Sequence, residues 1–493
     1  ALVITPEATI AVAPSARRGH ARVDGAWFRW DDGSFLYPIA YNIRSPVDTV
    51  DARFGAFPRP DAAMGSLVME GFIARLAAAR INVGRVWMSP WFGGLEWHQQ
   101  HAGYHGLGRY NLQNAWRLDQ LFACAARHGI LLELALWHHG PFTRAYDSQW
   151  KENPYNQAHG GPLSQPGEVM TDPEALRLAA DRLRYIAARW GADPALFAWT
   201  LWIESDAVAK PEPTIAWHRA AVEVLKRCDS GEHIISTEFC ATPGVEALWR
   251  SPDIGYVQMG GYSHADGLIR TFTKRAADLQ YGKPLVIEEY GGHSQGGGLR
   301  WTAHELHDGP WVGWMLPFAG TPMPWWWNLV FAHGLERHHH RFADYIAGED
   351  LRTTSWRYER PIVEGAPGLA ALARVSSERA FAWIHAPAIS DLRPSDRSWD
   401  NSADKAEQLY VERVGAFDPT ATTSTALFPE VAGARLRLDG LGLRPGRWRA
   451  EFWDTWSTAA PAQVELTIAE TGDQALALPA LSRDVAIKLV ALP

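Results

Sequence analysis

The chain has 493 residues, of which 47% are hydrophobic and 21% are charged, and its formal net charge is −8 at pH 7. This composition excludes a disordered chain, a collagen-like fibre and a small disulfide-stapled protein, and the length predicts one large domain with a smaller one. The mild acidity is spread along the chain, and no apolar stretch approaches the roughly 18 residues that span a bilayer. We therefore expect neither a nucleic-acid nor a membrane partner, and the oligomeric state stays open.

The first residue and the tryptophan content each carry one expectation. Because the sequence begins at Ala1 rather than at methionine, we expect a secreted or periplasmic protein whose leader has been removed. The chain holds 25 tryptophans, including the triplet Trp325-Trp326-Trp327. Such rings either fill a large core or line a surface that stacks flat, amphipathic ligands such as sugars.

Residues 1–34 form a predicted strand-rich lead-in, in which Asp31-Asp32-Gly33 is typical of a hairpin turn. From residue 35 to residue 355, short apolar runs alternate with helix-periodic runs, the pattern of β-strands joined by helices into a parallel sheet. The expected strands are 35–43, 81–88, 130–137, 196–202, 234–239, 254–259, 284–289 and 312–317. The expected helices include 65–80, 115–128, 173–190, 214–228 and a closing one at 335–348. This alternation predicts an α/β fold, a (β/α)8 TIM barrel.

A doubly wound open sheet is the alternative for residues 35–355, but no glycine-rich phosphate turn follows the first strand. The pattern changes in residues 356–493. Short alternating segments separated by turn residues occur there, at 380–385, 434–438, 448–453, 463–468 and 485–490. This spacing predicts a C-terminal antiparallel β-sandwich domain.

Two glutamates stand at the ends of expected barrel strands. Glu204 follows the fourth strand, and Glu289 ends the seventh. Side chains at the carboxyl ends of barrel strands point into the active-site mouth. Two carboxyl groups that share one cleft can divide glycoside cleavage, one as a protonated acid and the other as an ionised nucleophile. One isolated glutamate would be better explained as a solvated charge, whereas the pair favours a catalytic site.

With aromatic residues beside them, Glu204 and Glu289 resemble the acid/base and the nucleophile of the clan A retaining glycoside hydrolases, the cellulase, mannanase and β-glycosidase superfamily. The resemblance covers most of residues 20–350. It is closest to bacterial cellulase-like glycosidases that carry a C-terminal β-domain. The motifs that support it are Asn82-Val83-Gly84-Arg85-Val86-Trp87, Leu95-Glu96-Trp97, Asn153-Pro154-Tyr155-Asn156, the tryptophan triplet and, in the β-domain, Glu451-Phe452-Trp453-Asp454-Thr455.

The resemblance implies double displacement through a glycosyl-enzyme intermediate, with Glu289 as the nucleophile and Glu204 as general acid and then base. It also implies a carbohydrate substrate, an oligo- or polysaccharide with an equatorial scissile bond such as a β-D-glycoside or an α-L-arabinoside, and no cofactor. Adjacent residues of a strand face opposite sides, so only one of Glu288 and Glu289 can enter the mouth. The family pattern, a glutamate followed by an aromatic residue and glycine, selects Glu289, and Glu288 remains the alternative.

Two positions depart from the family pattern. Clan A enzymes usually place asparagine directly before the acid/base, where it hydrogen-bonds the sugar 2-hydroxyl, whereas this chain has Ile203. Three consequences are open: the reacting sugar lacks a normally placed 2-hydroxyl, another side chain replaces the contact, or activity is weak. The second departure is Asn328 after the tryptophan triplet, where relatives tend to carry aspartate.

Further residues at or after the strand ends are candidates for substrate binding. Arg85 resembles the family arginine that keeps the nucleophile ionised, since a nearby cation lowers a carboxyl pKa, and an ordinary ion pair is its alternative. The other candidates are Trp87, Trp91, Glu96, Trp97, His138, His139, Trp202, Glu238, Tyr262, Trp325, Trp326 and Trp327. Structural histidines, a buried glutamate and core tryptophans are the competing interpretations.

Other motifs compete with this interpretation. Gly292-His293-Ser294-Gln295-Gly296 matches the nucleophile elbow of serine hydrolases, but an elbow needs a strand directly before the serine and a helix directly after it. His338-His339-His340 cannot converge on one metal ion, because consecutive helical residues point about 100° apart, so we expect no metal. A non-catalytic carbohydrate-binding protein on a decayed glycosidase scaffold, motivated by Ile203, is the main alternative.

Overall fold

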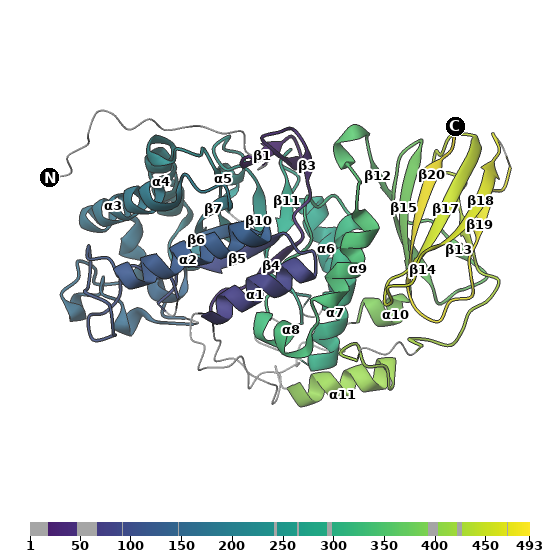
Figure 1. The fold of residues 1–493 in the computed structure, drawn as a ribbon. Coiled ribbons are helices and arrows are strands. Elements are labelled where there is room, and N and C mark those ends of the chain that lie inside the picture. Colours follow the sequence, from purple (N-terminus) through teal and green to yellow (C-terminus); the bar gives the residue numbers. More distant parts are fainter. Residues whose placement is uncertain are drawn as a thin grey trace.

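The structure is a computed structural model that describes residues 18–46, 67–90, 92–145, 147–240, 244–263, 266–292, 298–392, 403–421, 426–470 and 472–493. Trp91 and Ser294, both singled out above, lie outside these residues. Parallel strands and their helices occupy one part of the molecule, and antiparallel sheets of the C-terminal residues occupy the other (Figure 1). None of the helices in the described ranges combines the length with the apolar character that a bilayer crossing demands.

A small antiparallel sheet precedes the parallel strands and consists of β1 (Ala21–Asp24), β2 (Trp27–Trp30) and β3 (Phe35–Leu36). The expected hairpin turn joins β2 to β3, where the Gly33 amide donates to the Trp30 carbonyl at 3.0 Å. Gly33 has a φ of +85°, which glycine adopts without strain. The Phe28 ring centroid lies 5.2 Å from that of Phe197 and 5.4 Å from that of Tyr256. The small sheet therefore covers the amino-terminal ends of the parallel strands.

The parallel strands follow one another in chain order. One sheet contains β4 (Ala40–Asn42), β5 (Val83–Trp87), β6 (Leu131–His138), β7 (Leu196–Ile203) and β8 (Ile234–Ser236), each paired with the next. A second parallel sheet contains β9 (Glu238–Phe239), β10 (Val257–Met259) and β11 (Leu285–Ile287). Only Thr237 separates β8 from β9, so the second sheet continues the first along the chain. β5, β6 and β7 are buried along their whole length, as strands covered on both faces are.

The expected eighth strand at 312–317 is wrong, because the residues up to Met315 belong to helix α7 (Leu299–Met315). Every residue of α7 from Trp301 onward is buried. A helix without a polar face has no apolar periodicity that separates it from a buried strand, which explains the error. α7 also approaches the sheet closely, since a Cβ atom at Gly309 would overlap the Tyr290 ring.

Residues 319–325 lie where that strand was expected to pair. The amides of Ala319 and Met323 donate to carbonyls of β11 at 2.9 Å. On the other side, the Pro324 carbonyl accepts from the amide of Asn42 in β4 at 3.2 Å. The first and the last of the parallel strands therefore hydrogen-bond to the same segment.

The remaining helices connect these strands or follow them. They are α1 (Leu67–Ala78), α2 (Leu112–His128), α3 (Pro173–Trp190), α4 (Pro211–Cys228), α5 (Glu246–Trp249), α6 (Leu268–Asp278), α8 (Trp327–His333) and α9 (Arg337–Ile346). Short 3-10 helices are η3 (Gly140–Phe142), η4 (Trp150–Glu152), η5 (Gln157–His159), η6 (Pro166–Met170), η7 (Ser205–Ala207) and η8 (Leu351–Thr353). Local signals set the helix ends: the Asp172 carboxylate accepts from two amides at the start of α3, and Gly129 ends α2 with a φ of +69°.

The C-terminal residues form two antiparallel sheets. The larger has the strand order β12 (Arg357–Glu359), β14 (Ala370–Val375), β15 (Arg379–His385), β20 (Val485–Ala491), β17 (Gly446–Asp454) and β18 (Ala462–Ile468). The smaller contains β13 (Val363–Glu364), β16 (Arg435–Arg437) and β19 (Ala475–Ala477). Helices α10 (Pro387–Ser390) and α11 (Ala403–Val414) are additional to the elements expected here. Apolar side chains of both sheets, among them Val375, Leu436 and Trp448, share one core.

The larger sheet also packs against α7 and α9, and Asp484 is the polar centre of that junction. Its carboxylate accepts from Trp383 Nε1 at 2.9 Å and from Thr455 Oγ1 at 2.6 Å, and it lies 3.3 Å from His307 Nε2. Although burial raises it, His307 and these donors hold the pKa of Asp484 well below its usual range. Possible ligand atoms of Asp308, His307 and Asp484 lie within 4.8 Å of one another, a spacing that fits a metal ion. Because donors already surround the Asp484 carboxylate, we interpret the group as a buried ion pair.

Candidate active site

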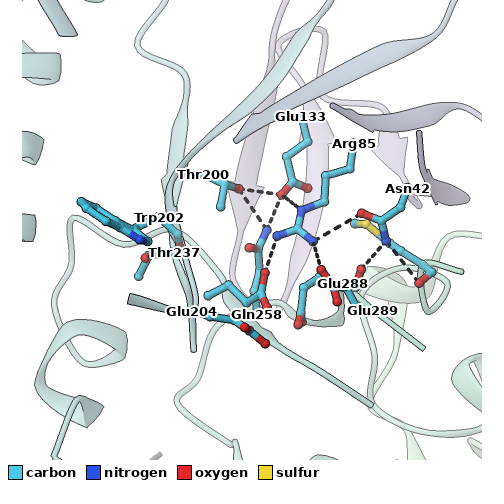
Figure 2. Close-up of polar contacts among 12 residues, drawn as sticks. Asn42, Arg85, Glu133, Thr200, Trp202, Glu204, Thr237, Gln258, Glu288 and Glu289 are labelled. Atoms are coloured by element: carbon cyan, nitrogen blue, oxygen red, sulfur yellow. Dashed lines mark hydrogen bonds and ion pairs between the residues drawn. The ribbon is translucent and has the colours of Figure 1, made fainter. Parts of the chain in front are cut away.

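Glu204 and Glu289 come from the carboxyl ends of β7 and β11. Glu204 directly follows β7, and Glu289 lies two residues beyond the end of β11. Figure 2 shows both glutamates on the same side of Arg85, which extends toward them from β5. The Glu204 amide donates to the carbonyl of Glu238 at 3.2 Å, and the Glu238 and Glu289 carboxylates both pair with Arg85. The structure therefore brings the two predicted catalytic carboxyl groups into one electrostatic site.

Arg85 is the positive centre of this site and is fully buried. Its Nε lies 3.2 Å from Glu133 Oε1, its Nη1 lies 3.5 Å from Glu289 Oε1, and its Nη2 bonds to Glu238. Burial lowers the pKa of Arg85, but these carboxylates raise it by more, so the guanidinium stays charged. One guanidinium thus serves three buried carboxyl groups, and its closest partner is Glu238 rather than Glu289.

Glu289 and Glu288 differ in their surroundings. The Tyr262 hydroxyl donates to Glu289 Oε2 at 3.1 Å, and the Glu289 side chain is 10% exposed. Burial and the Glu238 charge raise the pKa of Glu289 well above its usual range, while Arg85 and Tyr262 act against that rise. Glu288 is completely buried, and burial and Glu238 likewise raise its pKa. Of the two neighbours, Glu289 is the one that reaches both the cation and solvent.

Glu204 has an unusual backbone conformation. Its φ of +56° and ψ of +44° place it in the left-handed region, which costs a residue with a side chain about 1–2 kcal/mol. The turn starts η7 immediately after β7 and leaves the Glu204 side chain 24% exposed. Strained backbone of this kind concentrates at functional sites, because the surrounding structure must hold it in place.

His139 contacts the Glu204 carboxyl group. Its Nδ1 lies 3.0 Å from Glu204 Oε2, and its Nε2 lies 3.7 Å from a carboxylate oxygen of Asp147. Burial alone would lower the pKa of His139, but Asp147 and Glu204 raise it to about 9. Burial lowers the pKa of the neighbouring His138 well below the usual value. The two adjacent histidines therefore carry different charges at neutral pH.

The tryptophans expected to stack sugars form a buried cluster beside Arg85. Trp87 and Trp325 have ring centroids 5.1 Å apart, and Trp325 and Trp327 have centroids 5.2 Å apart. The indole N–H of Trp326 donates to the Gly291 carbonyl at 2.6 Å. Each of these rings is at least nine-tenths buried, and Trp325 is the most exposed at 7%. Trp87, Trp325 and Trp327 also lie against the Arg44 guanidinium, so these rings are largely covered by neighbouring side chains.

Glu96 and Trp97 line a small cavity next to His138. The cavity has a volume of about 30 Å³, room for water rather than for a sugar ring. Glu96 accepts from the Gly108 amide at 2.5 Å, and burial raises its pKa. Arg182 lines the same cavity. Among the described residues, those that line this cavity include neither Glu204 nor Glu289.

Trp202 is not brought to the two glutamates. Its ring is fully buried, with centroids 4.9 Å from Trp217 of α4 and 6.0 Å from Trp137. Figure 2 shows the ring directed away from Glu204. A position close to Glu204 in the sequence therefore does not place this side chain in the site, because the chain turns sharply at Glu204.

The sequence analysis did not identify two polar residues that contact the Arg85 guanidinium, Glu133 and Asn42. Glu133 in β6 accepts from Thr200 Oγ1 at 2.6 Å and from Gln258 Nε2 at 2.7 Å. Asn42 in β4 donates through its side chain to the Glu288 carbonyl at 2.7 Å. A signal for Glu133 was available, since a charged residue inside an apolar strand must find a buried partner.

Comparisons with known proteins concern the fold. No protein-family model matches the sequence, and no curated protein matches it. A solved structure described as a glycoside hydrolase aligns with a TM-score of 0.59 and 11% identity, over 96% of this chain and 97% of the other. A glycoside hydrolase family 5 structure from Bacteroides vulgatus aligns with a TM-score of 0.59 and 11% identity, over 96% of this chain and 94% of its own. Over nearly its whole length, this chain has the fold of these glycoside hydrolases.

Proposed function

We propose that this protein is a retaining glycoside hydrolase with Glu204 and Glu289 as its catalytic pair. The two glutamates contact different partners, and this contrast supports the proposal. The Glu204 carboxyl group contacts His139, whereas that of Glu289 contacts Arg85 and Tyr262. Two carboxyl groups in unlike environments can take the separate roles of proton donor and nucleophile. The likeness in fold to glycoside hydrolases supports the same assignment.

We propose the architecture that goes with this activity, a closed (β/α)8 barrel in residues 35–355 and a β-sandwich in residues 356–493. Closure is supported by residues 319–325, which hydrogen-bond to both β4 and β11. The sandwich is supported by the core that the two C-terminal sheets share. Active sites of such barrels lie at the carboxyl ends of the strands, where Glu204 and Glu289 are found.

In the proposed reaction, the Glu289 carboxylate attacks the anomeric carbon while Glu204 gives a proton to the departing glycosidic oxygen. The bond from the anomeric carbon to that oxygen breaks, and a glycosyl ester of Glu289 forms. Glu204 then takes a proton from water, whose oxygen attacks the anomeric carbon and releases Glu289. Two inversions at the anomeric carbon give net retention.

Arg85 and Tyr262 determine whether Glu289 can act as the nucleophile. A protonated carboxyl group does not attack, and burial with the Glu238 charge favours protonation of Glu289. The Arg85 guanidinium at 3.5 Å and the Tyr262 hydroxyl at 3.1 Å favour the ionised form. Activity is therefore expected to fall as the pH drops through the raised pKa of Glu289.

The substrate that fits the proposal is an oligo- or polysaccharide with an equatorial scissile bond. Ile203 is fully buried at the end of β7 and offers no donor to a sugar 2-hydroxyl. That contact belongs to a group of interactions which strengthen in the transition state. Ile203 is therefore also the observation that favours the second candidate, a carbohydrate-binding protein without turnover.

A panel assay separates the two candidates. Purified protein is incubated with dinitrophenyl glycosides of several sugars and with oligo- and polysaccharides, and released phenolate and reducing ends are measured. We expect hydrolysis of at least one substrate and its loss in Glu204→Gln and Glu289→Gln. Binding of a glycan without any hydrolysis across the panel would contradict the enzyme assignment. Inactivation by a fluorophosphonate together with loss of activity in Ser294→Ala would instead identify a serine hydrolase.

A further inference from the structure

The loop after β6 brings a second titratable group onto Glu204. His139 directly follows β6, and η3 starts at the next residue, so the His139 side chain is held between a strand end and a rigid turn. The ring is 8% exposed and faces the Glu204 carboxyl group with Nδ1 and Asp147 with Nε2.

We propose that His139 is a positioning residue that holds the proton which Glu204 delivers to the leaving group. This inference rests on the proposed function and adds a group to it. The geometry behind it is the 3.0 Å contact between His139 Nδ1 and Glu204 Oε2, closed on the far side of the ring by Asp147 at 3.7 Å. A histidine in contact with a carboxylate can hold a proton and pass it on.

The charges around the pair decide where that proton rests. Asp147 and Glu204 favour a protonated ring, and they raise the pKa of His139 to about 9 against the effect of burial. Among the described residues, His138 is a further titratable group beside the ring, with centroids 6.0 Å apart, and burial lowers its pKa. Glu238, whose carbonyl accepts from the Glu204 amide at 3.2 Å, is a second carboxyl group near Glu204. The form of the pair that these charges favour is therefore an imidazolium beside a carboxylate.

The proton balance of the first step follows from that form. The Nδ1–H bond of His139 breaks as an O–H bond forms on Glu204, which becomes a neutral acid. Glu204 then passes the proton to the glycosidic oxygen, which leaves as an alcohol while Glu289 bonds to the anomeric carbon. The ring ends neutral and Glu204 ends ionised. In the second step Glu204 takes a proton from the attacking water, and the proton returns to Nδ1 of His139.

The inference predicts an unusual alkaline limit of activity. If Glu204 worked alone, kcat/KM would fall in the range where a carboxyl acid tuned for catalysis loses its proton, about pH 6–7. With His139 holding the proton, kcat/KM falls only as the pH rises through about 9, the pKa of His139. Removing the ring is expected to slow substrates with poor leaving groups by about 10²- to 10⁴-fold, the usual contribution of general acid catalysis. Dinitrophenyl glycosides need no proton for departure and should be affected far less.

The test uses the full chain and compares wild type, His139→Gln and Asp147→Asn on a phenyl and a dinitrophenyl glycoside between pH 4 and about 10. In His139→Gln the alkaline limb should move to lower pH, and the phenyl substrate should lose much more rate than the dinitrophenyl substrate. In Asp147→Asn the alkaline limb of kcat/KM should also move to lower pH, but by less than in His139→Gln, because one of the two charges that raise the pKa of His139 is gone. His128→Gln, at the exposed end of α2, is the control and should match wild type.

The outcomes separate this inference from the proposed function. Wild-type activity with an unchanged alkaline limb and equal rate losses on both substrates in His139→Gln would overturn the role of His139 and leave the glycosidase assignment standing. An inactive wild type would contradict the proposed function itself. Thermal unfolding and circular dichroism of each variant show whether a loss of activity comes from unfolding rather than from the missing imidazole. Asp147→Asn supplies a second variant, at a side chain that is 59% exposed.

Discussion

Replacing Glu289 with glycine is expected to slow hydrolysis of a dinitrophenyl glycoside by roughly 10⁴- to 10⁶-fold, the range seen when a catalytic nucleophile is removed. Azide should restore turnover, because it can occupy the space that the carboxylate leaves beside Arg85 and Tyr262. Azide would then attack from the nucleophile's side in a single displacement. The glycosyl azide should therefore have inverted configuration, which proton NMR of the product determines.

Two matched variants make this result specific. In Glu204→Gly, azide should attack the glycosyl ester of Glu289, so the glycosyl azide should keep the configuration of the substrate. In Glu288→Gln, activity should stay within a few-fold of wild type, because Glu288 is completely buried and its raised pKa favours the neutral form. Near-normal turnover in Glu289→Gly together with azide-dependent turnover in Glu288→Gly would assign the nucleophile to Glu288.

Replacing Arg85 with methionine is expected to have the second-largest effect, on both stability and activity. Removing one partner of a buried ion pair leaves an uncompensated charge and typically costs about 3–5 kcal/mol. Arg85 forms ion pairs with Glu133, Glu238 and Glu289. Burial already raises the pKa values of Glu238 and Glu289, and the loss of Arg85 raises them further above those of the unfolded chain. A raised carboxyl pKa means that stability is kept at low pH and lost as the pH rises. The free energy of unfolding should therefore fall more steeply from pH 5 to pH 8 than in wild type.

Arg374 provides the control for this prediction. It is also completely buried, donates to the Leu316 carbonyl and lies over aromatic rings, and among the described residues no carboxylate forms an ion pair with it. Arg374→Met should therefore show no added loss of stability with rising pH. The residual activity of Arg85→Met should have its acidic limb at higher pH, since the pKa of Glu289 rises when its cation is removed. Equal pH dependence of unfolding in the two variants would contradict the role assigned to Arg85.

Much of the fold could be predicted from apolar patterning, and the errors have physical causes. β6 and β7 are long apolar runs between clear turn signals, and their expected positions agree with the structure to within one residue. The run at 312–317 is also apolar, but most of it lies in a helix with no polar face. Apolar character alone does not separate such a helix from a buried strand. Residues 319–325, rich in glycine and proline, bond to β4 and β11 without the sequence pattern of a strand.

Only those site residues whose positions are determined by the ends of strands could be predicted from the sequence. Glu204 and Glu289 follow from the ends of β7 and β11, because carboxyl ends of parallel strands meet at one edge. The contact of His139 with Glu204 depends on the left-handed backbone at Glu204, which no local pattern announces. The same turn explains why Trp202, two residues earlier, lies in the core. Arg85 was expected beside Glu289. Its closer contact with Glu238 depends on which carboxylate each guanidinium nitrogen contacts, and the sequence does not determine that.

Trapping of the covalent intermediate tests the central claim most directly. The wild-type protein is incubated with a 2-deoxy-2-fluoro dinitrophenyl glycoside of the sugar that it hydrolyses, and the intact mass and the peptide map are recorded. We expect one added glycosyl group per chain, located on Glu289, with loss of activity in proportion to labelling. Full hydrolysis of the parent glycoside with no covalent species, or a label on Glu288 or Ser294, would contradict it.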